Sequence, residues 1–523
     1  MRPIARGEVR HESSGVSNFV KGLALFVLIS CGVWVAVLWR WEVTSHDMNT
    51  RDIVVYLALF PLTVFALALM LRWAWQSAAQ RQAALAASVA TATATGAAAS
   101  KLASGGADEE RRHATVQLLG AFLVCAAGES AAELQEAAQT GAPRPAIDPE
   151  FTDADGLPVL TARIKALDTS AAAELDALLE VPLPAVRAKR PEWAELSPPD
   201  HVRRALSALE QPLLQAVGAL APWADRFEPE PSSSNAARDQ APARRVRVVL
   251  GWPAEWTEFE QALGLAFASE LIQTLGDAPI PRACFVFTSL AGSGEVLLAH
   301  ADRLLQTMTR EGHQEPLIVA ACHSTLSDSA VEALEREGQL FTASKRPKGR
   351  MPGEAAAVLV LADSAWPRDP AADGPVPHLH RPAVLMRDKS VDAPGRVTSD
   401  VLTQSVTQAL MAARLGVDAV AAITCDADQH SARGGEFHGS AMSLGAELDT
   451  EQDMRVLGTV TGAVGAVSTL LVVACAAQRA LFTEKPCLAV TLGDPFARLA
   501  LVALPGPPPP TEPSAAKPTA ATA

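Results

Sequence analysis

The sequence predicts an α/β domain that follows an N-terminal transmembrane helical hairpin. Two apolar runs near the N-terminus carry almost no charge, and each has the length of about 20 residues that a helix needs to cross a bilayer. From residue 113 onward, short apolar runs alternate with amphipathic helical stretches. That order is typical of helices packed over a largely buried sheet.

The first predicted span covers residues 19–39, where Lys21 at the edge is the only charged residue. The second covers residues 53–73 and contains Pro61, which a membrane helix tolerates when neighbouring groups satisfy the freed carbonyl. Tryptophans lie at the ends of both spans, where aromatic rings favour the membrane interface. We therefore predict that this hairpin anchors the chain in a lipid bilayer.

The charges beside the spans predict the orientation of the hairpin. Residues 1–18 are rich in arginine and more arginines follow the second span, whereas residues 40–52 mix both signs. The positive-inside rule then places both termini in the cytoplasm of a bacterial cell, with 40–52 as a short loop outside the inner membrane. Two alternatives to this hairpin are less favoured. A cleaved signal peptide would need an A-x-A-like site after the first span, which the sequence lacks. A buried helical hairpin of a soluble protein rarely contains two uncharged runs of this length.

Composition divides the rest of the chain. Residues 74–112 are rich in Ala, Ser, Thr and Gly, which predicts a tether, and residues 506–523 are Pro-rich and predict a disordered tail. The α/β domain is expected at 113–505, with residues 186–244 as an insertion because Pro and Ser accumulate near its end.

The predicted strands are mostly continuous apolar runs, as expected for strands buried on both faces. They cover residues 115–124, 246–252, 283–290, 316–322, 355–363, 419–425, 487–492 and 499–504. Helices are expected at 258–276, 294–312, 399–416 and 462–482. The last of these is apolar on all sides, so we place it in the middle of the domain; a third membrane span is the alternative.

Charge and cysteine content exclude several classes of function. The net charge is -14, whereas nucleic-acid binding requires clustered Lys and Arg, so no nucleic-acid partner is expected. The seven cysteines are scattered without a C-x-x-C pair, which predicts neither a zinc site nor a disulfide framework. Glycine-rich segments lack the Lys and Ser or Thr of a P-loop. No metal or cofactor is predicted.

Three segments resemble the thiolase-like fold of the β-ketoacyl synthases. KGRMPGEAAAVLVLAD (348–363) is similar to a Gly-Glu-Ala stretch that leads into an apolar strand, and RVLGTVTGAVGAVSTLLVVACAAQ (455–478) to a glycine-rich turn and central helix. LGDPFARLALVALPG (492–506) is similar to the closing strands. The resemblance covers 113–505 and implies a layered αβαβα domain that pairs through its sheets, as a homodimer or with an active synthase.

The resemblance also implies a cysteine nucleophile at a helix N-terminus, assisted by two histidines and a lysine. The nucleophile position corresponds to Ala291 in this sequence, and the first histidine position to Cys425. The second histidine corresponds to Thr459 and the lysine to Met454. These degenerate positions predict a fold that is retained without condensing activity, so no catalytic residue is assigned.

Other polar residues have structural interpretations. Cys322 and His323 are adjacent on a predicted strand, so their side chains should point to opposite faces. Ser293 precedes a helix and should be its N-cap, although it becomes a candidate nucleophile if the register shifts by two residues. Cys284 begins an apolar strand and should be part of the core.

Two histidine-bearing segments remain. His378 and His380 lie in a proline-rich stretch without further metal ligands, which favours a solvated loop. Residues 428–440 combine two histidines, an arginine and a glutamate with glycines. We expect a mobile surface loop there, and it is the best remaining candidate for contact with a small molecule or a partner.

Three functions follow from these observations. The leading hypothesis is a non-catalytic, membrane-anchored interaction or assembly module with an unknown protein partner. The second is an active acyl-transferring or condensing enzyme of lipid or polyketide metabolism whose nucleophile lies elsewhere. The third is an accessory component of an envelope or secretion machine, and the sequence neither favours nor excludes it.

Overall fold

The computed structural model describes residues 113–507 except 169–170, 228–243, 275–279, 370–373, 394 and 445–447. Both predicted membrane spans, their connecting loop and the tether therefore lie outside the described residues. Within the described part, no helix combines the length and the apolar character needed to cross a membrane. The prediction of an α/β class is confirmed for this part of the chain.

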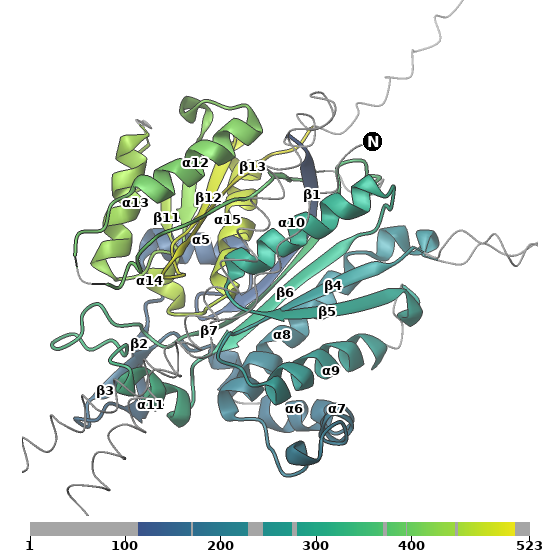
Figure 1. Ribbon diagram of the computed structural model, residues 1–523, viewed down its shortest axis with the longest axis vertical. Helices are drawn as coiled ribbons and strands as arrows, with labels where there is room; N and C mark the ends of the chain where they lie inside the picture. Colours follow the sequence, from purple (N-terminus) through teal and green to yellow (C-terminus); the bar gives the residue numbers. More distant parts are fainter. Residues whose placement is uncertain are drawn as a thin grey trace, which may run out of the picture. The chain divides into compact units, whose positions relative to one another are not determined.

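A large mixed sheet of 11 strands runs through the domain (Figure 1). Its strands are β1 (Thr115–Cys125), β4 (Val246–Trp252), β5 (Phe285–Ala291), β6 (Leu317–Ser324), β7 (Glu354–Asp363), β8 (His378–His380), β9 (Ala383–Met386), β10 (Ala422–Cys425), β11 (Met454–Val456), β12 (Cys487–Thr491) and β13 (Ala497–Leu504). The pair β2 (Ala146–Thr152) and β3 (Pro158–Thr161) forms a separate small sheet. Each predicted strand is present; the short strands β2, β3, β8, β9 and β11 were not predicted.

The sheet consists of two halves with the same strand order. In the first half the order is β5-β4-β6-β7-β1, and in the second it is β11-β10-β12-β13-β8. In both, the first three strands are parallel and the next two pairings are antiparallel. The halves join where β1 pairs with β8. This duplicated arrangement is consistent with the thiolase-like domain that the sequence predicts.

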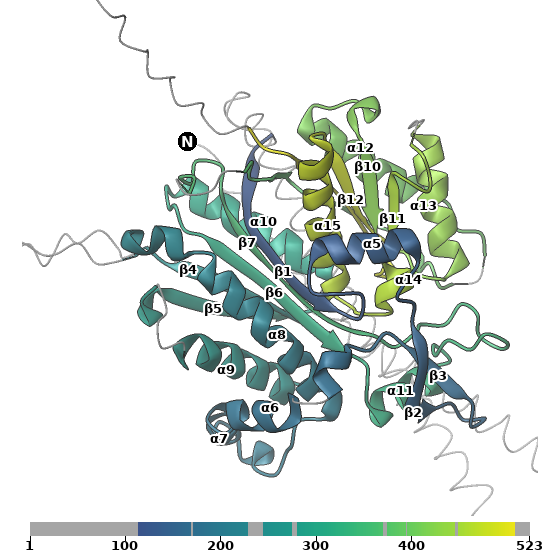
Figure 2. The same cartoon turned by 180° about the vertical axis from the view of Figure 1, so that it is seen from behind.

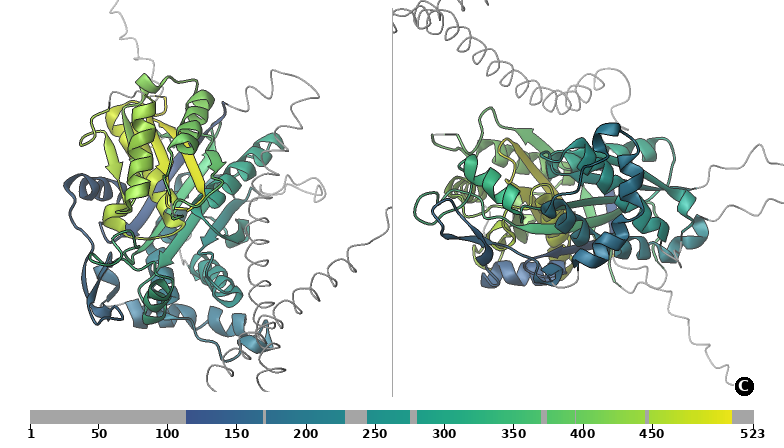
Figure 3. Two further views of the ribbon diagram at one scale, coloured as in Figure 1. Left: turned by 60° about the vertical axis from the view of Figure 1, so that its left-hand side comes forward. Right: turned by 90° about the horizontal axis from the view of Figure 1, so that it is seen from below.

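Helices form three layers around the two half-sheets. Helices α8 (Asp200–Gly218) and α9 (Glu258–Thr274) cover the first half, as Figure 2 shows, and α12 (Asp400–Ala413) and α13 (Ser431–Ser443) cover the second. Between the halves lie α10 (Gly294–Arg310) and α15 (Val467–Thr483), within the central apolar core. Figure 3 shows the same halves from two further sides. The shorter helices are α5 (Ala131–Thr140), α6 (Ala171–Leu179), α7 (Pro182–Arg187), α11 (Asp328–Arg336) and α14 (Gly458–Thr461).

Two expectations about helices have clear outcomes. Helix α15 is buried between the half-sheets, so the prediction of a central helix is confirmed. Helix α8 lies inside the expected insertion 186–244, yet Leu206, Leu209 and Leu213 are fully buried in the core against β6 and β7. This helix is therefore part of the layered domain and not a peripheral addition. The Pro and Ser residues that suggested an insertion follow it, in a segment outside the described residues.

Candidate functional site

A polar cavity of about 190 Å³ lies where α10 and α15 begin. The two helix starts are in close contact, because a Cβ on Gly294 would meet the Ala466 carbonyl oxygen at 2.4 Å. The cavity is lined by residues from strand ends, from the segments that follow them and from the first turns of helices: Glu255, Gly292, Ser293, Glu295, His323, Arg350, Asp426, Asp428, Arg433, Gly465, Ser468 and Asp494. The duplicated topology thus brings both halves of the chain to one site.

None of the four degenerate positions lines this cavity. Ala291 ends β5 directly before the lining residues of the α10 start. Cys425 ends β10, but its side chain packs in the outer core beyond the second half-sheet. The Thr459 hydroxyl donates to the Val456 carbonyl at 2.9 Å, and Met454 packs against the same outer core. The structure therefore brings the segments of Ala291 and Cys425 together without forming a group of these four side chains.

The cavity contains buried carboxylates that sequence reasoning missed. Asp426 accepts hydrogen bonds from the Leu492 amide at 2.6 Å and the Ser468 hydroxyl at 2.8 Å. Glu295 accepts one from the Thr491 hydroxyl at 2.6 Å. Burial, together with the charges of Asp494 and Asp426, raises the pKa of Glu295 to about 7. Burial also raises the pKa of Asp426. These acids are therefore more readily protonated in the site than they would be in water.

His323 faces this cavity while its neighbour Cys322 does not. Nε2 of His323 lies 3.4 Å from a carboxylate oxygen of Glu255, and the ring packs against Gly465. The side chain of Cys322 packs in the core under α8 and α9. The predicted separation of the two side chains is confirmed, because successive residues of a strand face opposite sides. Burial lowers the pKa of His323, so its imidazole is neutral at pH 7.

Ser293 is the N-cap residue of α10, as predicted. Its hydroxyl nevertheless makes no capping hydrogen bond, and the residue lines the cavity. An N-cap side chain stabilises a helix when it accepts a hydrogen bond from an amide of the first turn. An N-cap residue without this bond contributes less. Its hydroxyl is therefore available to other partners in the cavity.

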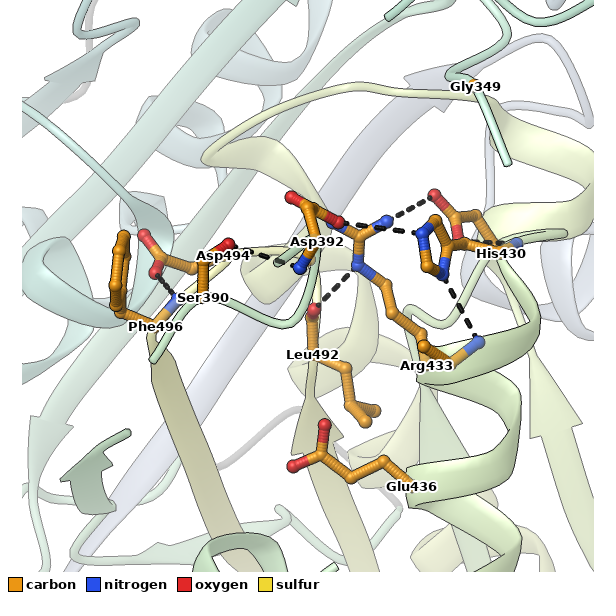
Figure 4. A network of polar contacts seen from close by, with 12 residues as sticks. Gly349, Ser390, Asp392, His430, Arg433, Glu436, Leu492, Asp494 and Phe496 are labelled. Carbon is orange, nitrogen blue, oxygen red and sulfur yellow. Dashed lines mark hydrogen bonds and ion pairs between the residues drawn. The ribbon is translucent and has the colours of Figure 1, made fainter. Parts of the chain in front are cut away.

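Residues 428–440 were expected to form a glycine-rich loop, and this expectation is wrong. They form the entry and most of α13, whose residue Arg433 is 2% exposed (Figure 4). The Arg433 guanidinium contacts Asp392 at 3.1 Å and Asp428 at 3.2 Å, and donates to the Leu492 carbonyl. His430 accepts a hydrogen bond from the backbone at the helix start. The glycines did not prevent a helix, because the buried arginine and its partners hold it against β12.

None of the described cysteines is suited to nucleophilic attack. Cysteines 125, 284, 322, 425, 475 and 487 are all buried, and burial raises the pKa of each thiol. Burial raises the pKa of the Cys125 thiol and that of the Cys487 thiol to about 11. Since the thiolate is the reactive form, these side chains are inert at neutral pH. Cys284 lies in the core, as predicted, and Cys31 lies outside the described residues.

His378 and His380 do not line this cavity. They belong to strand β8, whereas a solvated loop was expected, and His380 is 7% exposed. The His378 ring contacts the Val376 carbonyl at 3.0 Å. Among the residues that the structure describes, no group of three or more His, Cys, Asp or Glu side chains is arranged to hold a metal ion.

No family model and no curated protein sequence matches this chain. Among solved structures, it is similar to the ishigamide ketosynthase/chain length factor, at 16% identity and a TM-score of 0.45, over 75% of this chain and 100% of the other. It is also similar to a ketosynthase from module 6 of the bacillaene synthase of Bacillus subtilis 168, at 11% identity and a TM-score of 0.49, over 75% of this chain and 72% of the other. At these values the likeness bears on neither activity nor substrate.

Proposed function

We propose that this chain is a membrane-anchored, non-catalytic thiolase-like protein that acts as an interaction or assembly module at the cytoplasmic face of the bacterial inner membrane. The observation that carries the proposal is the polar cavity at the α10 and α15 starts, which has no thiol among its lining residues. The position expected for the nucleophile is Ala291, and an alanine cannot attack a thioester.

The charges in the cavity support the same proposal. Condensation requires a thiolate that accepts an acyl group and a site that accepts an anionic extender such as a malonyl thioester. Here Glu295 and Asp426 are buried and Asp494 is half-buried, and burial together with the charges of Asp494 and Asp426 raises the pKa of Glu295. Arg350 and Arg433 also line the cavity, but the carboxylates of Asp426 and Asp494 lie near enough to Glu295 to disfavour an additional negative charge beside it. The described lining of this cavity thus contains no thiol for condensation, and this supports the proposal.

Acyl transfer to the intact protein tests the proposal. We expect the purified full chain to form no covalent adduct with an acyl-coenzyme A thioester or with iodoacetamide under native conditions, as measured by intact mass. The variant Ala291→Cys should gain iodoacetamide labelling, because it places a thiol directly before the α10 start, and it serves as the positive control. An acyl adduct on any cysteine of the unmodified chain would contradict the proposal.

The alternative is an active acyl-transferring enzyme, and one observation favours it. Ser293 and His323 line the same cavity, and the Ser293 hydroxyl makes no capping hydrogen bond. A serine activated by a neutral imidazole is a known type of nucleophile. Labelling with a fluorophosphonate separates the two functions: an adduct that is lost in Ser293→Ala and in His323→Gln would establish the enzyme, and we expect none.

The surface we propose for pairing is the outer edge of β5. This strand ends the sheet, and its second edge has no strand partner among the described residues. Thr288 and Ser289 are exposed there, and an unpaired edge is a template for another strand. We expect the chain to be a dimer and Ser289→Lys to yield monomers, because paired lysines repel at a shared edge.

Light scattering of the full chain in detergent measures this change in mass. Gln273→Lys, which adds the same charge on the exposed side of α9, is the control and should remain dimeric. A dimer that persists in Ser289→Lys would show that pairing uses another surface. Co-purification of a different envelope protein with the chain would instead indicate an accessory role in an envelope or secretion machine.

A further inference from the structure

A second, larger cavity of about 430 Å³ lies along α10, from Leu298 to the end of the helix at Arg310. It shares no lining residue with the polar cavity described above. Its apolar lining comes from β1, α10, β7, β8 and β13: Val116, Leu298, Leu305, Leu361, Leu379 and Leu501. All five leucines are at least 95% buried. A cavity of this volume with mainly aliphatic walls is typical of a small-molecule site.

The charged residues of this cavity are at its solvent side, and only one of them lacks a partner. Asp302 forms an ion pair with Arg381 at 3.2 Å, and Asp363 accepts a hydrogen bond from the Thr309 hydroxyl at 2.5 Å. Arg310 is exposed and has no hydrogen bond or ion pair with any described residue. The two acids are therefore satisfied within the protein, while one guanidinium remains free for an anion.

His380 adds a buried polar group to the wall. Its Nδ1 is buried without a hydrogen-bond partner among the described residues. Burial, with nearby His113 and His378, lowers the pKa of this imidazole to about 4, so the ring is neutral at pH 7. A buried nitrogen without a partner is costly, and a ligand with a polar head can supply the missing hydrogen bond.

We infer that this cavity binds a single-chain fatty carboxylate, with its aliphatic tail among the buried leucines and its carboxylate paired with Arg310. Burial of a chain of methylenes against aliphatic walls provides the affinity. The guanidinium selects an anionic head over a cationic one. The inference does not rest on the proposed function, since this cavity is lined by neither Ala291 nor Ser293 and shares no lining residue with the polar cavity.

Photo-crosslinking in bacterial membranes that contain the full chain tests this inference. The probe is a diazirine- and alkyne-bearing analogue of dodecanoate, and the comparison compound is the matching alkyl trimethylammonium. We expect the carboxylate probe to label peptides from β1, α10 or β8, and the cationic compound to label them several-fold less. Arg310→Ala should lower carboxylate labelling about fivefold, as expected when one partly solvated ion pair is lost.

Two further variants make the result decisive. Arg303→Ala removes an exposed arginine of the same helix that does not line the cavity, and it should leave labelling unchanged. Ala114→Trp places a large side chain at an exposed lining position and should block labelling without disturbing the core. Equal thermal stability of all variants shows that they fold. Labelling that is insensitive to Arg310→Ala and Ala114→Trp, or that maps to other segments, would overturn the inference.

Discussion

At the scale of single residues, the buried acids of the polar cavity are the most informative side chains. Glu295 is 2% exposed and has the Thr491 hydroxyl as its hydrogen-bond partner, with Asp426 and Asp494 nearby. A carboxyl group in such a site prefers to remain protonated. Glu295 thus stabilises the fold less as the pH rises. The pH dependence of folding stability therefore reports on this cavity.

Glu295→Gln should raise the stability of the chain at pH 8. The pKa of Glu295 is about 7 in the folded chain and near its ordinary value of 4.5 in the unfolded one. Between these values the unfolded chain has released its proton and the folded chain has not, so folding stability falls as the pH rises through this window. Glutamine avoids the loss, which is on the order of 2 kcal/mol.

Thermal unfolding at pH 5 and pH 8 measures this difference. The variant and the unmodified chain should have similar Tm values at pH 5 and diverge at pH 8, with the variant higher. Glu311→Gln removes an exposed carboxylate at the other end of α10 and should show no such divergence. A variant that is less stable than the unmodified chain at pH 8 would mean that Glu295 is stabilised as an anion.

At the scale of elements, a buried ion pair holds α13 against the second half-sheet. Glu436 on α13 and Arg498 on β13 are both fully buried, and they form two contacts at 2.9 and 3.0 Å. Arg387 adds a third contact to the same carboxylate at 2.7 Å. Together with Arg433, these groups explain why a glycine-rich segment is helical, since its polar residues are satisfied only when α13 is docked.

Glu436→Gln should destabilise the chain by about 3 kcal/mol or more, because it leaves the buried Arg498 without a countercharge. Urea unfolding followed by circular dichroism measures the change. Glu332→Gln, on the exposed side of α11, is the matched control and should alter stability by less than about 0.5 kcal/mol. Equal midpoints for the two variants would show that the buried pair does not hold α13 in place.

At the scale of the whole molecule, the domain is a duplicated fold in which α10 lines both the polar and the apolar cavity described above. The polar cavity lies at the start of α10, and the apolar one lies farther along the same helix, from Leu298 to Arg310. The proposed anchor adds a third feature, namely attachment of this domain to a bilayer. In the role that we propose, the domain would assemble at a membrane surface, and the apolar cavity would bind its ligand apart from the polar cavity.

The predicted topology is tested by reporter fusions to the full chain. Alkaline phosphatase is active only outside the inner membrane, so we expect activity when it is inserted after Ser45 and none when it is fused after residue 523. Green fluorescent protein at the C-terminus should fluoresce, because it folds in the cytoplasm. Phosphatase activity at the C-terminal fusion would contradict the predicted placement of both termini.

Several features of the fold were predictable from local pattern alone. The long strands and the central helix α15 are continuous apolar runs, and such runs report burial on all sides whatever their partners are. The opposite orientation of Cys322 and His323 follows from strand geometry. The absence of a thiol at Ala291 was also evident once the resemblance placed that residue. These properties depend on a few consecutive residues, so the sequence by itself determined them.

Only the tertiary structure decided which distant residues meet. Glu295, Asp426 and Asp494 belong to three separate segments, and nothing in each segment indicates that the others are near. Helix α8 was taken for part of an insertion and α13 for a loop, because their stability comes from contacts with β6, β7 and β13 more than from their own composition. The apolar cavity likewise requires five elements at once. The local sequence pattern indicates how buried a residue is. A site depends on which buried side chains lie next to one another, and this is decided by the topology of the chain.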